Sequence, residues 1–237
     1  MAVRARHGVE AAVRAILLAA ALLPALGGAA LLAGCAGSPV PPDWQANAHA
    51  SLRNFSAAYY AGNAKLAAQE FERARAEIAS TGRPDLLARA ELVRCAARVA
   101  SLEFDECPGF LALAADAGKE ERAYADFLAG RWQGLDASLL PAQHRALLKG
   151  GADVGALAEI KDPMSRLVAA GVLFRLGRLT PAGIDAAADT ASDYGWRRPL
   201  LAWLGVQAKR AEAVGDQADA ARIRRRIELV LSAAAAP

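Results

Sequence analysis

The chain has 237 residues, of which 28 are Lys or Arg and 25 are Asp or Glu, so its net charge is +3. The first 34 residues hold three of the arginines and one glutamate, which leaves 25 basic and 24 acidic side chains in the remainder. This balance argues against a nucleic-acid-binding protein, which has a clear basic excess. About 200 residues suffice for one well-buried domain, so we expect one domain and no nucleic-acid partner.

The first 34 residues have the pattern of a secretory signal peptide. Their arginine-containing start is followed by residues 16–32, which hold no charge and are mostly Leu and Ala. A positive start, an apolar stretch and small residues at its end are typical of an export signal. The stretch is close to the length of a membrane span, but Pro24 and Gly27–Gly28 interrupt it. The pattern therefore favours a cleaved signal over a permanent anchor.

Four residues at the end of the apolar run, Leu32-Ala33-Gly34-Cys35, resemble the lipobox of bacterial lipoproteins. The resemblance implies that residues 1–34 are removed, that Cys35 is acylated, for example by palmitate, and that the lipid anchors the protein in the cell envelope. In enteric members of that family an Asp after the cysteine favours the inner membrane. Here Ala36 follows, which favours the outer membrane, facing the periplasm, over the inner membrane. The alternative is an uncleaved signal anchor with a chance cysteine.

Residues 35–42 then form a proline-rich tether, because prolines favour extended conformations. The folded domain is expected over residues 43–232 and a flexible tail over 233–237. Within the domain, apolar residues recur at steps of three and four, as Trp44, Leu52, Phe55 and Tyr59 do, which predicts helices. The expected helices cover 44–59, 66–78, 85–104, 109–117, 119–130, 141–149, 163–176, 180–194, 198–214 and 217–232.

Local signals set the limits of several of these helices. Gly62-Asn63 ends the first one, and the stretches "GRWQGLD" and "LKGGADVGA" are expected to be loops. Thr180-Pro181 predicts an N-cap followed by proline at the first helical position. Gly215-Asp216 predicts a C-terminal glycine followed by a second N-cap.

The spacing of Gly62, Ala67, Phe71 and Ala74 resembles the second helix of the tetratricopeptide repeat. Two further sets share the spacing less completely: Gly215, Ala220, Arg224 and Ile227, and Gly177, Ala182, Ala186 and Asp189. The resemblance implies an all-α array of antiparallel helical hairpins, a tetratricopeptide-like solenoid that is irregular in its middle. The glycines at 177 and 215 are 38 residues apart, longer than the usual period of about 34, so an irregular helical domain remains the alternative.

Besides Cys35, two cysteines remain after removal of the signal, Cys95 and Cys107. In an exported protein such a pair can form a disulfide. Two buried free thiols are the main alternative, and a metal-binding pair is the least favoured one because no further His or Cys lies at ligand spacing.

The sequence contains no established catalytic motif, such as a Walker-type glycine loop, a Gly-x-Ser-x-Gly elbow or a His-Glu-x-x-His pair. His49 and His144 are expected on the surface or at helix caps rather than in catalysis. The carboxylates of Glu103, Asp105 and Glu106 could bind calcium or act in acid–base chemistry, but an acidic turn before a helix is the favoured interpretation. We therefore expect no enzyme activity, no cofactor and no metal site.

Two groups of side chains are candidate contact residues for a partner. One consists of Trp132 and Trp196, which lie beside glycines and arginines in expected turns. The other is a basic run near the C-terminus, formed by Arg222, Arg224, Arg225 and Arg226. A solvated helix end is the simpler interpretation of this run, and contact with anionic lipid headgroups or an acidic partner is the more specific one.

The resulting hypothesis is a non-enzymatic lipoprotein whose helical domain docks an unidentified envelope protein in the periplasm, because helical-repeat arrays expose an extended concave surface. Its membrane contact would be made through the N-terminal lipid. The first alternative is a cell-wall-acting enzyme or its helical accessory domain. A second alternative is a helical domain that binds a small apolar ligand between its helices.

Overall fold

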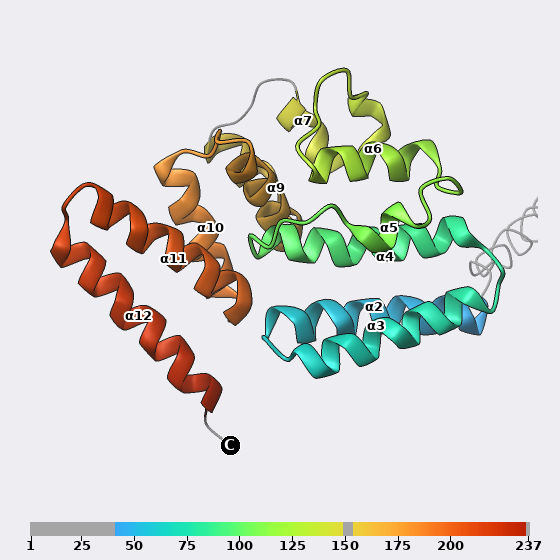
Figure 1. The fold of residues 1–237 in the computed structure, drawn as a ribbon, viewed down its shortest axis with the longest axis horizontal. Helices are drawn as coiled ribbons and strands as arrows, with labels where there is room; N and C mark the ends of the chain where they lie inside the picture. The colour runs from blue at the N-terminus through green and yellow to red at the C-terminus, as the bar shows by residue number, and fades with distance from the viewer. Residues whose placement is uncertain (1–40, 149–153, 236–237) are drawn as a thin grey trace, which may run out of the picture. The chain divides into compact units, whose positions relative to one another are not determined.

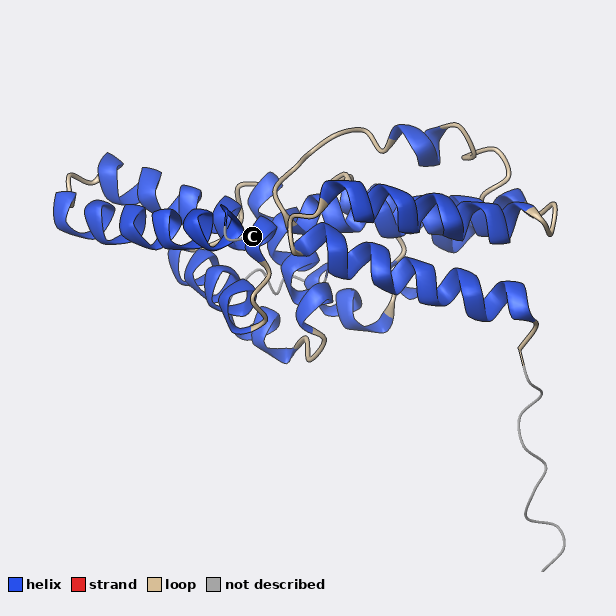
Figure 2. Cartoon of the chain, turned by 90° about the horizontal axis from the view of Figure 1, so that it is seen from below, coloured by secondary structure: helices blue, strands red, loops and turns tan. Residues whose placement is uncertain are grey.

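The computed structural model of the chain describes residues 41–148 and 154–235, and these residues form helices, turns and loops without any strand (Figure 2). The all-α class expected from the periodicity is therefore confirmed for the described part of the chain. The signal peptide, the lipobox with Cys35, tether residues 35–40 and tail residues 236–237 lie outside the described residues. Among the described helices, none is both long enough and apolar enough to cross a membrane.

Seven long helices make up most of the described part of the chain (Figure 1). They are α2 (Asp43–Tyr60), α3 (Ala64–Ala79), α4 (Pro84–Ala100), α9 (Pro163–Arg175), α10 (Pro181–Asp193), α11 (Arg197–Ala213) and α12 (Gln217–Ala235). Residues 101–162, which we call the connecting segment, join α4 to α9 through short elements. These are α5 (Pro108–Leu111), α6 (Lys119–Leu128), η2 (Ala137–Leu139), η3 (Ala142–His144), α7 (Arg145–Leu148) and α8 (Val154–Glu159).

Each long helix packs against the next long helix in the chain, including α4 against α9 across the connecting segment. The connecting segment packs on α4 and α9 through α6. An additional contact joins α2 to α11, which are far apart in sequence. An open solenoid has contacts only between neighbouring repeats, so the α2–α11 contact and the connecting segment are departures from a plain array.

Several helix ends follow the signals in the sequence. Gly62 has φ +82°, a left-handed conformation that glycine adopts without strain, and it ends the turn between α2 and α3. The Thr180 side chain accepts a hydrogen bond from the Gly183 N–H at the start of α10. The Asp216 side chain accepts one from the Asp219 N–H at 2.9 Å at the start of α12. The N-caps predicted at these two positions are confirmed.

The end of α4 was predicted wrongly, because the helix stops at Ala100 rather than continuing to residue 104. The Leu102 N–H bonds to the Val99 carbonyl and the Glu103 N–H to the Arg98 carbonyl, the pattern of a Schellman motif. In this motif the left-handed position is usually glycine, but here it is Leu102, with φ 58°. No glycine marked the end in the sequence.

Other boundaries within the connecting segment also differ from the prediction. The helix expected over 109–117 is only the four residues of α5, followed by turns, and the one expected over 141–149 is split into η3 and α7. Part of the expected loop "LKGGADVGA" is helical, since α8 begins at Val154. At the C-terminus, α12 continues to Ala235, so residues 233–235 of the expected tail are helical.

The main core lies where α4, α9 and α11 meet. The Cβ of an alanine at Gly171 would lie 2.2 Å from the Val99 carbonyl oxygen, so α9 and α4 cross with their backbones in close approach. The fully buried Trp203 of α11 donates its indole N–H to the Ala100 carbonyl at 3.2 Å. We call this region the α4–α9 junction.

The positions that resemble a tetratricopeptide repeat differ in burial. Ala67, Phe71 and Ala74 of α3 are buried, as close packing of a hairpin requires. In the other two sets, Ala220 is buried but Arg224 is exposed, and Asp189 of α10 is exposed. Of the three sets, the one on α3, in the hairpin formed by α2 and α3, therefore agrees best with the burial that the resemblance implies.

Candidate functional site

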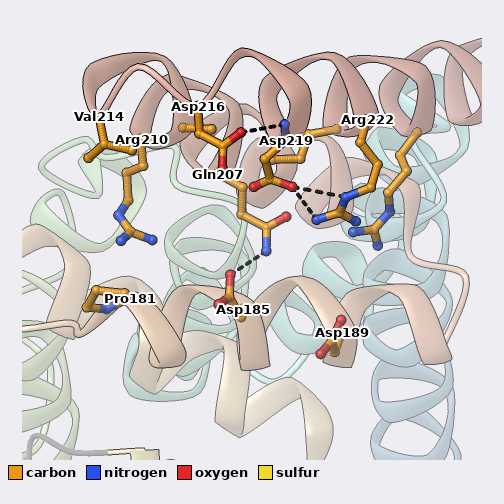
Figure 3. A pocket seen from close by; sticks show the side chains of 12 residues that line it. Pro181, Asp185, Asp189, Gln207, Arg210, Val214, Asp216, Asp219 and Arg222 are labelled. Carbon is orange, nitrogen blue, oxygen red and sulfur yellow. Dashed lines mark hydrogen bonds and ion pairs between the residues drawn. The ribbon is translucent and has the colours of Figure 1, made fainter.

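A groove of about 370 Å³ runs between α10 and α12, with α11 as its floor. Both outer helices pack against α11, and their facing sides supply the two walls. Figure 3 shows this groove from close by. Its lining is formed by Pro181, Asp185, Asp189, Gln207, Arg210, Ala211, Val214, Asp216, Asp219, Arg222, Ile223 and Arg226.

Helical spacing places these side chains on facing surfaces. Asp185 and Asp189 are four residues apart on α10, so they lie on one face of that helix. Arg222 and Arg226 have the same spacing on α12, and the buried Ile223 beside them packs inward. The caps at Thr180 and Asp216 fix where the two walls begin. The spacing of these residues along α10 and α12 and the positions of the two N-caps therefore determine which side chains line the groove.

Some of the charged and polar groups in the groove are bonded to one another. The Gln207 side-chain amide donates to the Asp185 carboxylate at 2.7 Å, linking the floor to the α10 wall (Figure 3). The Arg222 guanidinium donates to the Asp219 carboxylate, with its Nε at 2.9 Å. These bonds hold two of the acidic groups in place.

Other groups in the groove have no partner among the described residues. Arg210 and Arg226 form no ion pair there, and neither does the exposed Asp189. The Gln207 side-chain oxygen is buried and accepts no hydrogen bond from a described residue. The groove therefore has unmet capacity for anionic groups at its two arginines, whereas the Gln207 oxygen is enclosed by the protein itself. It can bind a polar chain segment.

The basic run is divided by this geometry. Arg222 and Arg226 line the groove, whereas Arg224 forms an ion pair with Glu212 of α11 and Arg225 is exposed without a described partner. The sequence shows four arginines within five residues, and their positions on the helix separate them into groove-lining and outward-facing groups.

The two candidate tryptophans pack against the protein. Trp132 stacks on Phe127 with ring centroids 5.5 Å apart and donates its indole N–H to the Phe127 carbonyl at 3.1 Å. Trp196 lies 5.0 Å from the ring of Tyr60 and 4.9 Å from that of Tyr194. Both are half-buried and lie outside the groove. Tyr194, by contrast, is 56% exposed.

Cys95 and Cys107 are joined through their sulfur atoms, and their Cα atoms lie 5.7 Å apart, within the usual range for a disulfide. Together with the Asp105 carboxylate they form the one cluster of potential metal ligands among the described residues. A closed disulfide removes both thiolates from such a cluster. We predict that the pair is also bridged in the exported protein.

The acidic residues of "LEFDEC" are each paired with arginine. Glu103 contacts Arg198 at 2.9 Å. Asp105 contacts Arg98 at 3.1 Å and also accepts a hydrogen bond from the Cys107 N–H at 3.0 Å. Glu106 contacts Arg175 at 3.3 Å. Carboxylates neutralised in this way by separate helices favour a structural role over calcium binding or acid–base chemistry.

His144 was expected at the surface or at a helix cap, and that prediction is wrong. Its ring is 1% exposed and stacks on Phe127 and Tyr124. One ring nitrogen, Nε2, lies 3.1 Å from the Ser165 carbonyl, and the other has no described partner. Burial lowers the pKa of His144, against the opposing effect of the Ser165 carbonyl. Nothing in the sequence around His144 distinguished it from the exposed His49.

Comparisons of the chain with protein-family models, curated proteins and solved structures find no match. The site must therefore be interpreted from its own geometry and chemistry.

Proposed function

We propose that the protein is a lipid-anchored component of the bacterial cell envelope, and that its helical domain is a non-enzymatic scaffold that docks a protein partner in the groove over α11. The observation that carries the proposal is the pair of arginines in that groove that form no ion pair with a described residue, Arg210 and Arg226. The consecutive packing of α9 to α12 supports a tetratricopeptide-like array as the architecture.

The partner segment is expected to be extended and acidic. An extended chain can lie along the groove with its backbone over Gln207. Acidic side chains on either side can then pair with Arg210 and Arg226. Hydrogen bonds to charged groups contribute about 1.5–3 kcal/mol each, so two arginine pairs are sufficient to select acidic segments over neutral ones. The negative charges of Asp185 and Asp189 would repel a segment that is acidic along its whole length.

The anchor is supported by the sequence of residues 32–35 and by the proline-rich stretch after it. A lipid on Cys35 would hold the groove close to its membrane-associated partner and raise the effective concentration. We expect the mature protein to begin at Cys35 and to carry the mass of a lipid, measured by mass spectrometry of purified protein. Recovery of an unmodified Met1 terminus would contradict the anchor without affecting the groove.

Photo-crosslinking in intact cells tests the docking groove directly. A photoreactive amino acid at Asp189, exposed at the groove wall, should capture one dominant envelope protein. The same amino acid at Gln69, exposed on α3 away from the groove, should not capture it. The captured protein should then be lost when Arg210 and Arg226 are both changed to Glu.

The neighbouring Arg225 supplies the matched control, because it is exposed on the same helix but does not line the groove. We expect Arg225→Glu to leave crosslinking from Asp189 unchanged. Capture of the same proteins from Asp189 and Gln69, or capture that survives the double charge reversal, would refute docking in the groove.

A further inference from the structure

A second hollow, of about 520 Å³, lies between α4, α6 and the chain around η2, well separated in sequence from the groove over α11. This is within the usual range of small-ligand pockets. Its wall is mainly apolar and comes from three separate parts of the chain. The apolar part consists of Leu92, Val93, Tyr124, Leu139, Leu140 and Pro141.

The hollow exists because α6 is short and the chain does not return over it as a full helix. After Leu128 the chain forms loops and the single turn η2, whose start is capped by the Asp136 side chain accepting from the Ser138 N–H at 2.8 Å. Leu140 is then buried in the core, while the space between α4 and α6 stays partly uncovered. We call this space the α4–α6 pocket.

Charged groups at the edge of the α4–α6 pocket differ in whether they are neutralised. Arg89 donates to the Glu121 carboxylate, with its Nε at 2.9 Å, so these two charges compensate each other. Arg145 donates its Nε to the Leu140 carbonyl at 2.8 Å and pairs with no carboxylate among the described residues. Its position is therefore fixed by a backbone contact while its two terminal nitrogens remain available.

The remaining charge at the edge, Glu120, is exposed and has no described contact that holds it in place. An anchored guanidinium loses less side-chain freedom on binding than an unanchored carboxylate does. The pocket is thus better prepared for an anionic group than for a cationic one. The planar guanidinium group of one arginine can donate two parallel hydrogen bonds to a carboxylate. The negative charges of the nearby glutamates disfavour a doubly charged phosphate.

We propose that the α4–α6 pocket binds an aliphatic carboxylic acid, whose chain packs between Leu92, Val93 and Leu139 and whose carboxylate pairs with Arg145. This inference is independent of the proposed docking groove, since the two sites share no lining residue. It also gives the small-ligand alternative from the sequence a specific place and a specific chemistry.

The test uses the full-length chain and dodecanoic acid that carries a photoreactive diazirine on its chain. After irradiation, mass spectrometry of proteolytic peptides should locate the label on residues 89–93, 124 and 138–141. The methyl ester of the same probe, which lacks the charge, should label these peptides about tenfold less, as expected for loss of one charged hydrogen-bonded pair. Unlabelled dodecylamine should compete more weakly than unlabelled dodecanoic acid.

Two variants and one control assign the effect to named residues. Arg145→Gln should reduce labelling by the acid about tenfold and leave labelling by the ester unchanged. Val93→Trp, which fills the hollow from its half-buried wall, should reduce labelling by both probes. The control is Arg122→Gln, because Arg122 is an exposed arginine that donates to the Ala117 carbonyl but does not line this pocket.

Three results would overturn the proposal. They are labelling spread over peptides outside the pocket, equal labelling by the acid and the ester, and stronger competition by the amine than by the acid. The melting temperature of each variant, measured alongside, identifies a variant that has lost its fold. If Val93→Trp unfolds the protein, the Arg145→Gln comparison still decides the outcome, because Arg145 is exposed and outside the core.

Discussion

The α4–α9 junction and the C-terminal helix α12 are held in the fold by different kinds of contact. At the junction the Val99 carbonyl lies against Gly171, and the Trp203 indole bonds to a carbonyl at the end of α4. Helix α12 packs on α11 through a narrow apolar face, and its Leu229 and Leu231 are 70% and 52% exposed. Backbone contact between distant segments fixes the junction, whereas α12 packs on a single neighbouring helix and keeps part of its surface exposed.

Ion pairs reinforce the junction from outside. Arg198 at the start of α11 donates to the Tyr59 carbonyl of α2 at 3.0 Å and to Glu103 of the connecting segment at 2.9 Å. Its guanidinium also lies 4.4 Å from the centroid of the Tyr59 ring. One side chain thus joins the first long helix, the loop after α4 and α11. Burial, and the nearby Glu103 carboxylate, raise the pKa of Tyr59, so its phenol stays neutral.

The largest effect is expected from Gly171→Ala. The added Cβ would overlap the Val99 carbonyl oxygen, and two helix backbones cannot separate without disturbing the core. Overpacking of this kind costs about 1–3 kcal/mol and occasionally more, and we expect the upper end of that range. The measurement is the free energy of unfolding from urea denaturation.

Gly205 of α11 is the matched control. It is also a helical glycine, but a Cβ placed there meets no atom within 4 Å. Gly205→Ala should raise the free energy of unfolding by up to about 1 kcal/mol, because alanine favours the helix. Equal effects at the two glycines would show that the close approach at the junction does not limit stability.

The disulfide is expected to have the next largest effect, because it attaches the loop after α4 to the junction. Changing Cys95 and Cys107 together to Ser should lower the free energy of unfolding by about 2–3 kcal/mol. Reductant should lower the stability of the natural chain in the same way and leave the variant unchanged. Alkylation of two thiols in protein purified without reductant would contradict the bridge.

Much of this helical framework was predictable from the sequence, and the errors have a common cause. Helix ends marked by glycine or by a capping side chain, such as those at Gly62 and Thr180, were predicted correctly. The end of α4 depends on Leu102 in a left-handed conformation, which tertiary contacts impose and local sequence does not signal. The connecting segment was predicted least well. Its elements are too short to show an apolar periodicity in the sequence, and they are stabilised by packing on the long helices.

The candidate sites were predictable only in part, for a related reason. Arg222 and Arg226 were noticed as part of a charge run, but the acidic wall at Asp185 and Asp189 belongs to another helix. Tertiary packing places α10 and α12 on the two sides of α11, and the residue pattern within one helix does not predict this arrangement. The α4–α6 pocket is harder still, since its walls come from three separate segments whose apolar residues look like ordinary core.

A pH effect of intermediate size is expected from His144, a residue of the connecting segment that packs against α9. Burial lowers its pKa in the folded state, so the unfolded chain binds the proton more readily. The stabilisation is complete above the unfolded-state pKa of about 6.5 and is lost as the pH falls below it. His144→Phe should remove this part of the acid dependence, measured as the free energy of unfolding between pH 5 and pH 8.

The control for this change is His49→Phe, since His49 is exposed on α2. We expect it to keep the acid dependence of the natural chain. An unchanged slope below about pH 6.5 in His144→Phe would contradict the assignment.

The smallest effect is expected at α12, where Arg224 pairs with Glu212 of α11 and both side chains are about half exposed. Exposed ion pairs contribute little because water screens them and both side chains lose freedom. Arg224→Gln should therefore lower the free energy of unfolding by at most about 0.5 kcal/mol, and Arg225→Gln, at an unpaired position, by less. A loss above about 1 kcal/mol would mean that α12 is held as firmly as the junction. Near-zero losses would instead show that neither Arg224 nor Arg225 contributes to the stability of the fold.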